Sequence, residues 1–147
     1  MSYAIQPMTI EDYDEVYALW QSSEGIGLSA ADSRAGIARF LERNPGLAFV
    51  ARRSPDLAGA VMVGEDGRRG YLYHLAVSPS HRRQGIGRSL VETCMAALRQ
   101  RGIQKCHIFV YGANQAGLAF WDQLAFQLRP DLVIMSRDII VPPKTFI

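Results

Sequence analysis

The middle of the chain changes from a strand pattern to a helix pattern over a short stretch. Three runs of strand-like composition come first, at residues 47–52, 57–63 and 71–77, and turn-forming residues separate them. From Gly87 to Arg101 the apolar side chains instead recur along one face of a helix, which Gly102 ends. An antiparallel meander that leads into an amphipathic helix predicts a mixed α/β domain.

The remaining segments extend this domain in both directions. The apolar stripe from Tyr13 to Trp20 predicts a first helix, and Thr9 with Asp12 three residues later is a variant of the capping box that starts helices. The polar, glycine-bearing loop after this helix is predicted to face a substrate. We therefore expect a single domain over residues 1–147, with strands at 4–8, 47–52, 57–63, 71–77, 105–111 and 133–139 and helices at 10–22, 33–43, 87–101 and 115–124.

Charge and composition exclude several classes of protein. The 147 residues carry 16 Lys and Arg against 14 Asp and Glu, a net charge of +2, so we expect no nucleic-acid partner. Neither a secretory leader nor an apolar run of about 18 residues is found, which predicts a cytoplasmic protein without membrane contact. Cys94 and Cys106 lie in apolar segments and are predicted to be reduced core residues. The three histidines lack the spacing of metal ligands, so no metal site is expected.

A glycine-bearing turn joins the last strand of the meander to the helix. Gly85 and Gly87 allow a ligand to approach the backbone closely, and the helix that starts there directs its free N–H groups and the positive end of its dipole toward an anion. Arg82, Arg83 and Arg88 add positive charge around the same point. These features predict a phosphate-binding turn. A surface turn with solvated arginines is the alternative.

Neither of two familiar phosphate-binding loops fits this turn. A P-loop requires Gly-Lys-Ser/Thr at the start of the helix, whereas here Gly87 is followed by Arg88 and Ser89. A dinucleotide-binding loop requires a third glycine where this chain has Leu90. The turn is therefore predicted to hold a phosphate by another geometry, as a handle on the ligand rather than as the reacting group.

Two motifs resemble those of the GNAT superfamily of N-acetyltransferases. The run Arg82-Arg83-Gln84-Gly85-Ile86-Gly87 resembles the signature Arg/Gln-x-x-Gly-x-Gly/Ala, and it follows a strand that ends in Val77-Ser78-Pro79. Downstream, Asn114 and the segment from Phe120 to Phe126 are similar to the family's Asn-x-x-Ala-x-x-Phe-Tyr-Glu-Lys-Leu-Gly-Phe. The resemblance implies the family's α/β fold, an α+β mixed sheet that is largely antiparallel in its N-terminal part and has splayed fourth and fifth strands.

The resemblance also implies acetyl-CoA as co-substrate, no metal, and direct transfer of the acetyl group to a primary amine of a small molecule or a protein. Amides of the glycine turn would hold the pyrophosphate, the end of the fourth strand would pair with the pantetheine arm, and a backbone N–H near position 75 would stabilise the tetrahedral intermediate. The protein is expected to be a monomer or a homodimer. The implied cofactor-binding residues are Leu75, Ala76, Val77, Arg82, Arg83, Gln84, Gly85, Ile86, Gly87, Arg88 and Asn114.

The sequence defines the catalytic groups less well. The attacking amine must lose a proton, and His74 is the titratable group best suited to accept it, although a half-buried structural histidine is the alternative. The family's tyrosine that protonates the departing thiolate is replaced by Trp121, whose indole has no transferable proton, so Tyr111 or solvent is expected to serve. This departure leaves a second hypothesis, an acyl-CoA-binding or interaction module with little transfer activity. Asp32 could attract a cationic acceptor, but an acidic residue in such a loop is more often a solvated charge, so it is assigned no role.

Overall fold

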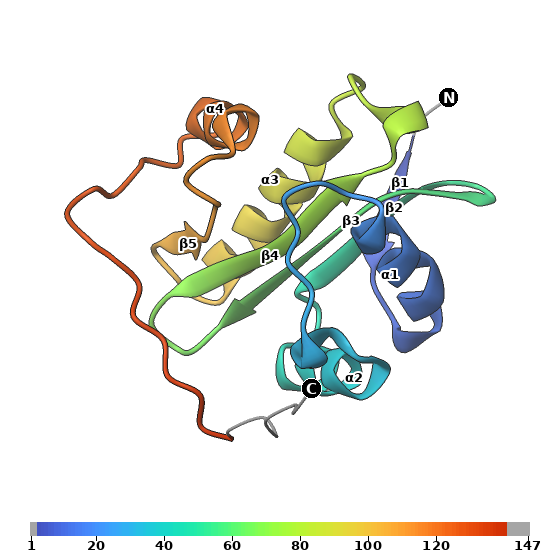
Figure 1. Ribbon diagram of the computed structural model, residues 1–147. Helices are drawn as coiled ribbons and strands as arrows, with labels where there is room; N and C mark the ends of the chain where they lie inside the picture. Colours follow the sequence, from blue (N-terminus) through green and yellow to red (C-terminus); the bar gives the residue numbers. More distant parts are fainter. Residues whose placement is uncertain (1–2, 141–147) are drawn as a thin grey trace, which may run out of the picture.

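A five-stranded sheet forms the centre of the molecule, of which the computed structural model describes residues 3–140 (Figure 1). The strands lie side by side in chain order. The first four pair antiparallel, as predicted for the runs separated by turns, and the fifth pairs parallel with the fourth. Their bounds are β1 Ala4–Pro7, β2 Ala48–Arg53, β3 Asp56–Glu65, β4 Gly70–Val77 and β5 Cys106–Ile108.

The four predicted helices are confirmed, three of them to within one residue at either end, whereas the first three residues of the helix predicted at 10–22 form a separate 3₁₀ helix. They are α1 Tyr13–Gln21, which the short 3₁₀ helix η1 (Ile10–Asp12) precedes, α2 Arg34–Arg43, α3 Ile86–Gln100 and α4 Gln115–Gln123. Two further 3₁₀ helices are η2 Ala30–Asp32 and η3 Pro79–His81. Across residues 3–140, none of these helices combines the length and the apolar character that crossing a bilayer requires.

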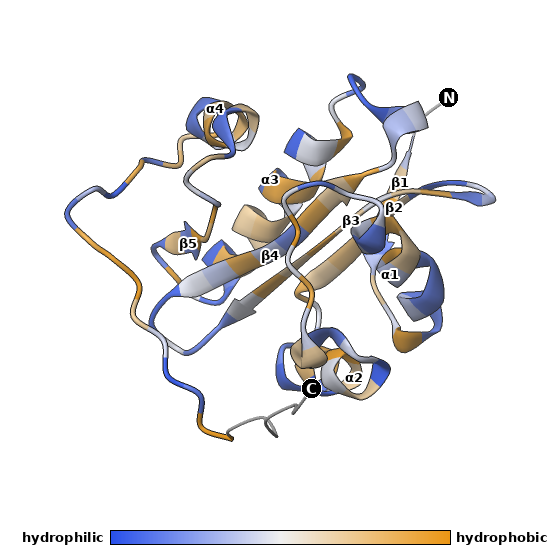
Figure 2. Cartoon of the chain, viewed as in Figure 1, coloured by the Kyte–Doolittle hydropathy of each residue, from blue (hydrophilic) through white to orange (hydrophobic). Residues whose placement is uncertain are grey.

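Helices cover both faces of the sheet, and the sheet separates the core into two halves. On one face α3 packs against β2, β3 and β4, and its buried residues include Leu90, Cys94 and Leu98. On the other face α1 and α2 pack over the sheet, with Trp20 and Ile37 fully buried. Because both faces are covered, β3 is buried continuously over residues 58–64. Figure 2 accordingly shows the middle strands as mostly apolar and the outward turns of α1 and α2 as polar.

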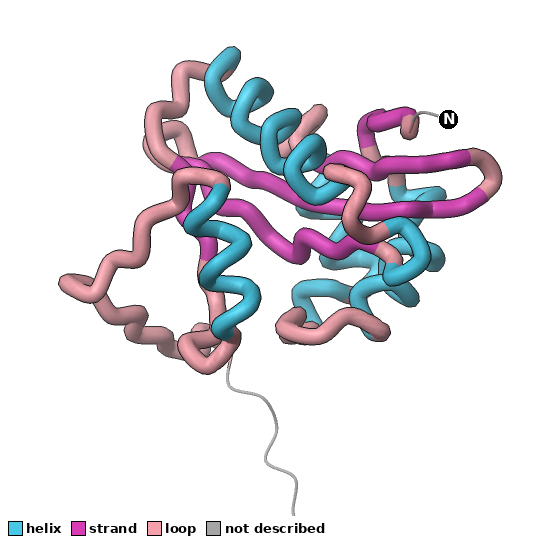
Figure 3. The backbone as a smooth tube through the Cα atoms, turned by 90° about the horizontal axis from the view of Figure 1, so that it is seen from above, coloured by secondary structure: helices cyan, strands magenta, loops and turns pink. Residues whose placement is uncertain are grey.

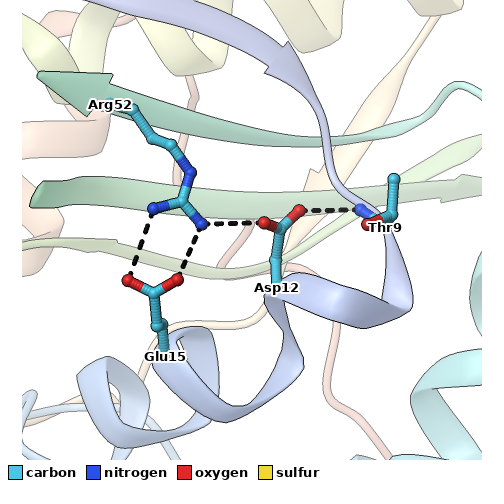
Figure 4. A network of polar contacts seen from close by, with 4 residues as sticks. All are labelled: Thr9, Asp12, Glu15 and Arg52. Atoms are coloured by element: carbon cyan, nitrogen blue, oxygen red, sulfur yellow. Dashed lines mark hydrogen bonds and ion pairs between the residues drawn. The ribbon is translucent and has the colours of Figure 1, made fainter. Parts of the chain in front are cut away.

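Arg52 of β2 fixes the start of α1 against the sheet (Figure 4). Its Nη2 donates to Asp12 at 2.7 Å and to Glu15 at 2.9 Å, and its Nη1 reaches the second oxygen of Glu15 at 3.3 Å. Asp12 also accepts the backbone N–H of Thr9 at 2.9 Å, so the predicted capping box is formed. The start of α1 is thereby attached to β2 before the chain reaches the loop that follows the helix.

A β-bulge interrupts β4 at His74. The pairing of β3 with β4 passes from Ala60 opposite Ala76 to Met62 opposite Tyr73, so two residues of β4 face one residue of β3. His74 has a φ of 55°, in the left-handed region, and its carbonyl accepts a hydrogen bond of 3.0 Å from the indole of Trp20. A buried side chain of α1 therefore holds the backbone of the bulge.

The fourth and fifth strands separate beyond their first residues. Gly70, Tyr71 and Leu72 pair with Cys106, His107 and Ile108, after which β5 ends while β4 continues to Val77. The splayed strands implied by the family resemblance are thus confirmed. Among residues 3–140 no strand pairs with the second half of β4 on this side, so the backbone there is open toward α4.

Two expectations about the C-terminal part are corrected. The strand predicted at 105–111 is only Cys106–Ile108, and the strand predicted at 133–139 does not form (Figure 3). Side chains of that second segment are exposed, 91% for Met135 and 97% for Ile139. The apolar composition fits a strand, but a strand also needs a paired neighbour, and no described strand extends beside these residues.

Candidate active site

The turn before α3 exposes unpaired backbone N–H groups. Gly85 is the residue before the helix, with a φ of 79°, and it has no side chain that could cap the helix. The first hydrogen bond of the helix runs from the N–H of Ser89 to the carbonyl of Gly85, at 3.0 Å. The amides of the first turn before Ser89 therefore have no partner within the helix. No acidic residue lies in this turn, so the positive end of the dipole is not neutralised.

The two glycines of the turn have different surroundings. A Cβ atom added at Gly85 would meet no atom within 4 Å, so this position opens onto free space. A Cβ atom at Gly87 would lie 3.3 Å from the ring of Phe120 in α4. Gly85 thus leaves room for a ligand, whereas Gly87 allows α3 and α4 to approach each other closely.

Side chains around the turn bind it to the rest of the molecule. The hydroxyl of Tyr3 donates to Gln84 at 2.7 Å, and it lies 3.1 Å from Nδ1 of the buried His81. Arg82 donates through Nε to the carbonyl of Val77 at 3.3 Å. Arg83 and Arg88 are exposed. The side-chain oxygen of Gln84 thus accepts from Tyr3 and, at 3.2 Å, from Arg53.

A cavity of about 800 Å³ lies beside the open half of β4. We call it the donor-side cavity. It brings together five of the residues implied as cofactor-binding, and Tyr111 as well, with the loop that follows α1. Its lining residues are Leu75, Ala76, Val77, Arg82, Asn114, Tyr111, Pro79, Ala113 and Ser22–Gly25. Among the described residues, the other implied residues of the glycine turn lie outside this lining.

Asn114 has a structural task as well as a place in this cavity. Its side-chain oxygen accepts the N–H of Gly117 at 2.9 Å and so caps α4. Its Nδ2 lies 3.0 Å from the position that a Cβ atom would take on Gly25, and the hydroxyl of Tyr111 lies against Gly27. The loop after α1 therefore meets the connection between β5 and α4 across the cavity.

A second cavity, of about 500 Å³, lies on the other side of the bulge. We call it the acceptor-side cavity. Residues of η2, α2, β3 and β4 line it, including Asp32, Arg39, Phe40, Tyr73 and His74. His74 and the next residue, Leu75, thus line different cavities. At the bulge in β4, two consecutive residues of the chain therefore line the two different cavities.

His74 is paired with a buried carboxylate. Its Nε2 lies 2.9 Å from Oδ1 of Asp32, and Asp32 is only 6% exposed. The second oxygen of Asp32 accepts the N–H of Ser29 at 3.0 Å, and the hydroxyl of Tyr13 donates to the Asp32 carbonyl at 2.7 Å. The interpretation of Asp32 as a solvated charge is therefore wrong. Burial of a carboxylate is favourable only with such partners.

One feature of the sequence could have shown that Asp32 has a structural role. Ser29 and Asp32 have the same spacing as Thr9 and Asp12, and both pairs form capping boxes in the structure. The capping box fixes the carboxylate at the end of the loop after α1. The contact with His74 could not be read from the spacing, because the two residues are 42 positions apart.

The aromatic residues near the site differ in surroundings. Burial raises the pKa of Tyr73, which lines the acceptor-side cavity. Tyr111 lines the donor-side cavity and is 61% exposed. Trp121 packs edge-on against Phe120 and Phe126, with ring centroids 5.0 and 5.2 Å apart, and is not among the described residues that line either cavity. In this structure Trp121 fills space between α4 and the chain that follows it.

Comparisons with known proteins agree with this arrangement. Residues 13–126 match the acetyltransferase (GNAT) family. An acetyltransferase of Yersinia enterocolitica is 32% identical over 130 residues, covering 88% of this chain and 91% of that protein. The ribosomal-protein-S18-alanine N-acetyltransferase from Escherichia coli has a TM-score of 0.72 at 25% identity, over 85% of this chain and 77% of that one.

The PaiA N-acetyltransferase from Thermoplasma acidophilum, solved in complex with coenzyme A, has a TM-score of 0.77 at 20% identity, over 88% of this chain and 92% of that one. The family match extends from the first residue of α1 to just beyond α4, which is most of the chain. This chain belongs to the acetyltransferase (GNAT) family.

Proposed function

We propose that this protein transfers the acetyl group of acetyl-CoA to a primary amine at the bulge of β4. The observation that carries the proposal is the division of neighbouring residues between two cavities, with Leu75 on the donor side and His74 on the acceptor side. Direct transfer requires the two substrates to meet at one point, each entering from its own side. The bulge supplies such a point.

The residues of the donor side fit acetyl-CoA. The unpaired amides at the start of α3, the open space at Gly85 and the exposed Arg83 and Arg88 suit a pyrophosphate group. The backbone of Leu75, Ala76 and Val77 would pair with the amide-bearing pantetheine arm. A neighbour in fold was solved with coenzyme A, and acetyl-CoA, when bound here, would supply the thioester carbonyl that the amine attacks. A backbone N–H near Leu75 would donate to that oxygen.

His74 is assigned as the proton acceptor for the amine. A carboxylate can only accept hydrogen bonds, so the contact with Asp32 requires a proton on Nε2 of His74. The neutral imidazole then has its lone pair on Nδ1, which is the nitrogen left to take a proton from the amine. Asp32 stabilises the cation that results. Asp32 is therefore a positioning residue, and His74 is the catalytic residue.

Tyr111 is assigned as the proton donor to the departing thiolate. It lines the donor-side cavity, whereas Trp121 lines neither cavity and carries no transferable proton. The same replacement by Trp121 favours a second candidate function, a module that binds acyl-CoA and transfers little or nothing. The two candidates differ in turnover and not in binding.

The test is release of the CoA thiol from acetyl-CoA in the presence of a panel of primary amines, with acetyl-CoA affinity measured by calorimetry in parallel. Amine-dependent release with formation of the N-acetyl product supports the transferase. Binding of acetyl-CoA without release across the whole panel supports the binding module. Absence of binding contradicts both candidates.

A further inference from the structure

The acceptor-side cavity has two arginines on one wall. Arg39 and Arg43 belong to α2 and both line the cavity. Residues four positions apart lie on the same face of a helix, so both arginines lie along the same wall of the cavity. Asp32 is the acidic residue in the lining, and its carboxylate is already bound to His74. The cavity therefore has an excess of positive charge on its α2 side.

The described structure shows no stabilising contact for either of these arginines. Within residues 3–140, neither Arg39 nor Arg43 takes part in a hydrogen bond, an ion pair or a ring contact. Arg34 of the same helix differs, because it pairs with Asp14 at 3.5 Å and lies over the ring of Tyr13 at 5.4 Å. Arg43 lies in the last turn of α2, where a cation is favourable to the helix dipole, but Arg39 lies a full turn earlier.

The distance between these arginines and His74 fits a small acceptor molecule. Asp32, the partner of His74, lies just before α2, and at 1.5 Å per residue Arg39 lies about 7.5 Å along the helix from its first residue, Arg34. Side chains on a helix lean toward its N-terminus, which brings the guanidinium groups back toward His74. Apolar side chains, Ile37, Phe40 and Met62, line the space between. The volume of about 500 Å³ is typical of a pocket for a small molecule.

We propose that Arg39 and Arg43 select small primary amines that also carry a carboxylate, bound with the amine at His74 and the carboxylate at α2. The guanidinium group matches the two oxygens of a carboxylate in a bidentate contact. The acceptor is then of the amino-acid type with an apolar spacer. This proposal rests on the acetyl transfer proposed above and specifies its acceptor.

Matched pairs of amines test it. We suggest 3-aminopropanoate to 6-aminohexanoate, each compared with its uncharged carboxamide, so that the reacting amine and the spacer stay the same. The wild-type protein should use at least one acid with a kcat/KM roughly tenfold above that of its amide, the usual scale of one charge-assisted hydrogen bond. Arg39→Gln and Arg43→Gln should each remove most of this preference through KM, because they should raise the KM of the acid much more than that of the amide.

Arg99→Gln is the matched control. Arg99 lies in the last turn of α3, as Arg43 does in α2, and it is exposed and outside the acceptor-side cavity. It should keep the preference for the acid. Thermal unfolding of all three variants, which should lie within a few degrees of the wild type, separates loss of binding from loss of fold.

The outcomes are distinct from those of the proposed function. Equal use of acid and amide by the wild type, or an equal loss on both in the arginine variants, overturns the selection of carboxylates and leaves acetyl transfer intact. Transfer to the amines of peptides but to none of the small acids overturns the assignment to small molecules. No thiol release with any amine overturns acetyl transfer itself, and with it this proposal.

Discussion

The imidazole of His74 lies 2.9 Å from the carboxylate of Asp32, and both side chains are largely buried. His74 also has a positive φ of 55°, which costs a residue with a Cβ atom about 1–2 kcal/mol. Trp20 holds its carbonyl and Asp32 holds its ring, so two parts of the N-terminal half fix one strained residue of β4. Strain maintained in this way at the junction of two cavities supports a functional role for His74.

Replacement of His74 tests that role. In His74→Gln, kcat at neutral pH should fall by about 10²- to 10³-fold, the usual contribution of a general base, while the Kd for acetyl-CoA stays within twofold. The deficit should narrow as the pH rises toward the pKa of the amine, since the amine then loses its proton without help. His107→Gln is the control, because His107 is half-buried on β5 and lies against Tyr71, away from both cavities. An unchanged pH–rate profile in His74→Gln would rule out a base at this position.

Asp32→Asn should act through His74. An amide can donate to Nε2 and so favour the wrong tautomer of the imidazole, and kcat should fall about 10-fold or more with little change in size or packing. The pH–rate profile should shift as well, because the carboxylate no longer stabilises the imidazolium. Thermal unfolding and the affinity for acetyl-CoA give the comparison. A loss of stability that accounts for the whole loss of activity would reduce Asp32 to a capping residue.

Gly85→Ala tests the phosphate-binding turn. Its φ of 79° makes any side chain unfavourable by about 1–2 kcal/mol, and the added Cβ atom occupies the open space at the start of α3. We expect the Kd for acetyl-CoA to rise at least tenfold, measured by calorimetry. Gly102→Ala is a close control, because Gly102 ends the same helix with the same φ of 79° and also has no atom near its Cβ position. Equal affinities in the two variants would exclude the turn as the binding site.

Trp121→Tyr tests whether the departure from the family motif affects chemistry. Trp121 packs between Phe120 and Phe126 and lines neither cavity, so the smaller ring should cost about 1 kcal/mol in unfolding free energy and leave kcat within about twofold. Tyr111→Phe should instead lower kcat, with the acetyl-CoA affinity retained. Steady-state thiol release measures both. A large loss in Trp121→Tyr would mean that the indole shapes the site.

The thiols of the buried Cys94 and the half-buried Cys106 should make stability depend on alkaline pH. Burial raises the pKa of Cys94 from 9.0 to about 12 and that of Cys106 to about 11. Above pH 9 the unfolded chain loses these protons while the folded chain keeps them, so the unfolding free energy falls, by up to about 1.4 kcal/mol per pH unit for each thiol, until the folded pKa is reached. Denaturant unfolding between pH 8 and 10.5 measures the slope, and Cys94→Ala should reduce it. A slope that is the same in Cys94→Ala and the wild type would contradict the assignment.

Sequence periodicity predicted the elements that pack through one continuous face. The helices and the meander follow from such local patterns, and so does the turn at Gly85. The role of Asp32 did not follow, because its partner lies on a distant strand, and neither did the facing of His74, because a bulge changes the alternation along β4. The expected strand at 133–139 was wrong because apolar composition does not supply a neighbour for pairing.

The bulge in β4 also separates the parts of the chain that form the two cavities. The acceptor side takes much of its wall from residues 30–44, which precede the meander, whereas the phosphate-binding turn follows the meander at Gly85. Under the proposed function, substitutions in η2 and α2 would change the accepted amine without altering the residues proposed to bind acetyl-CoA. A new acceptor would then evolve mainly through changes in one short segment, and the residues of the donor side would be inherited unchanged.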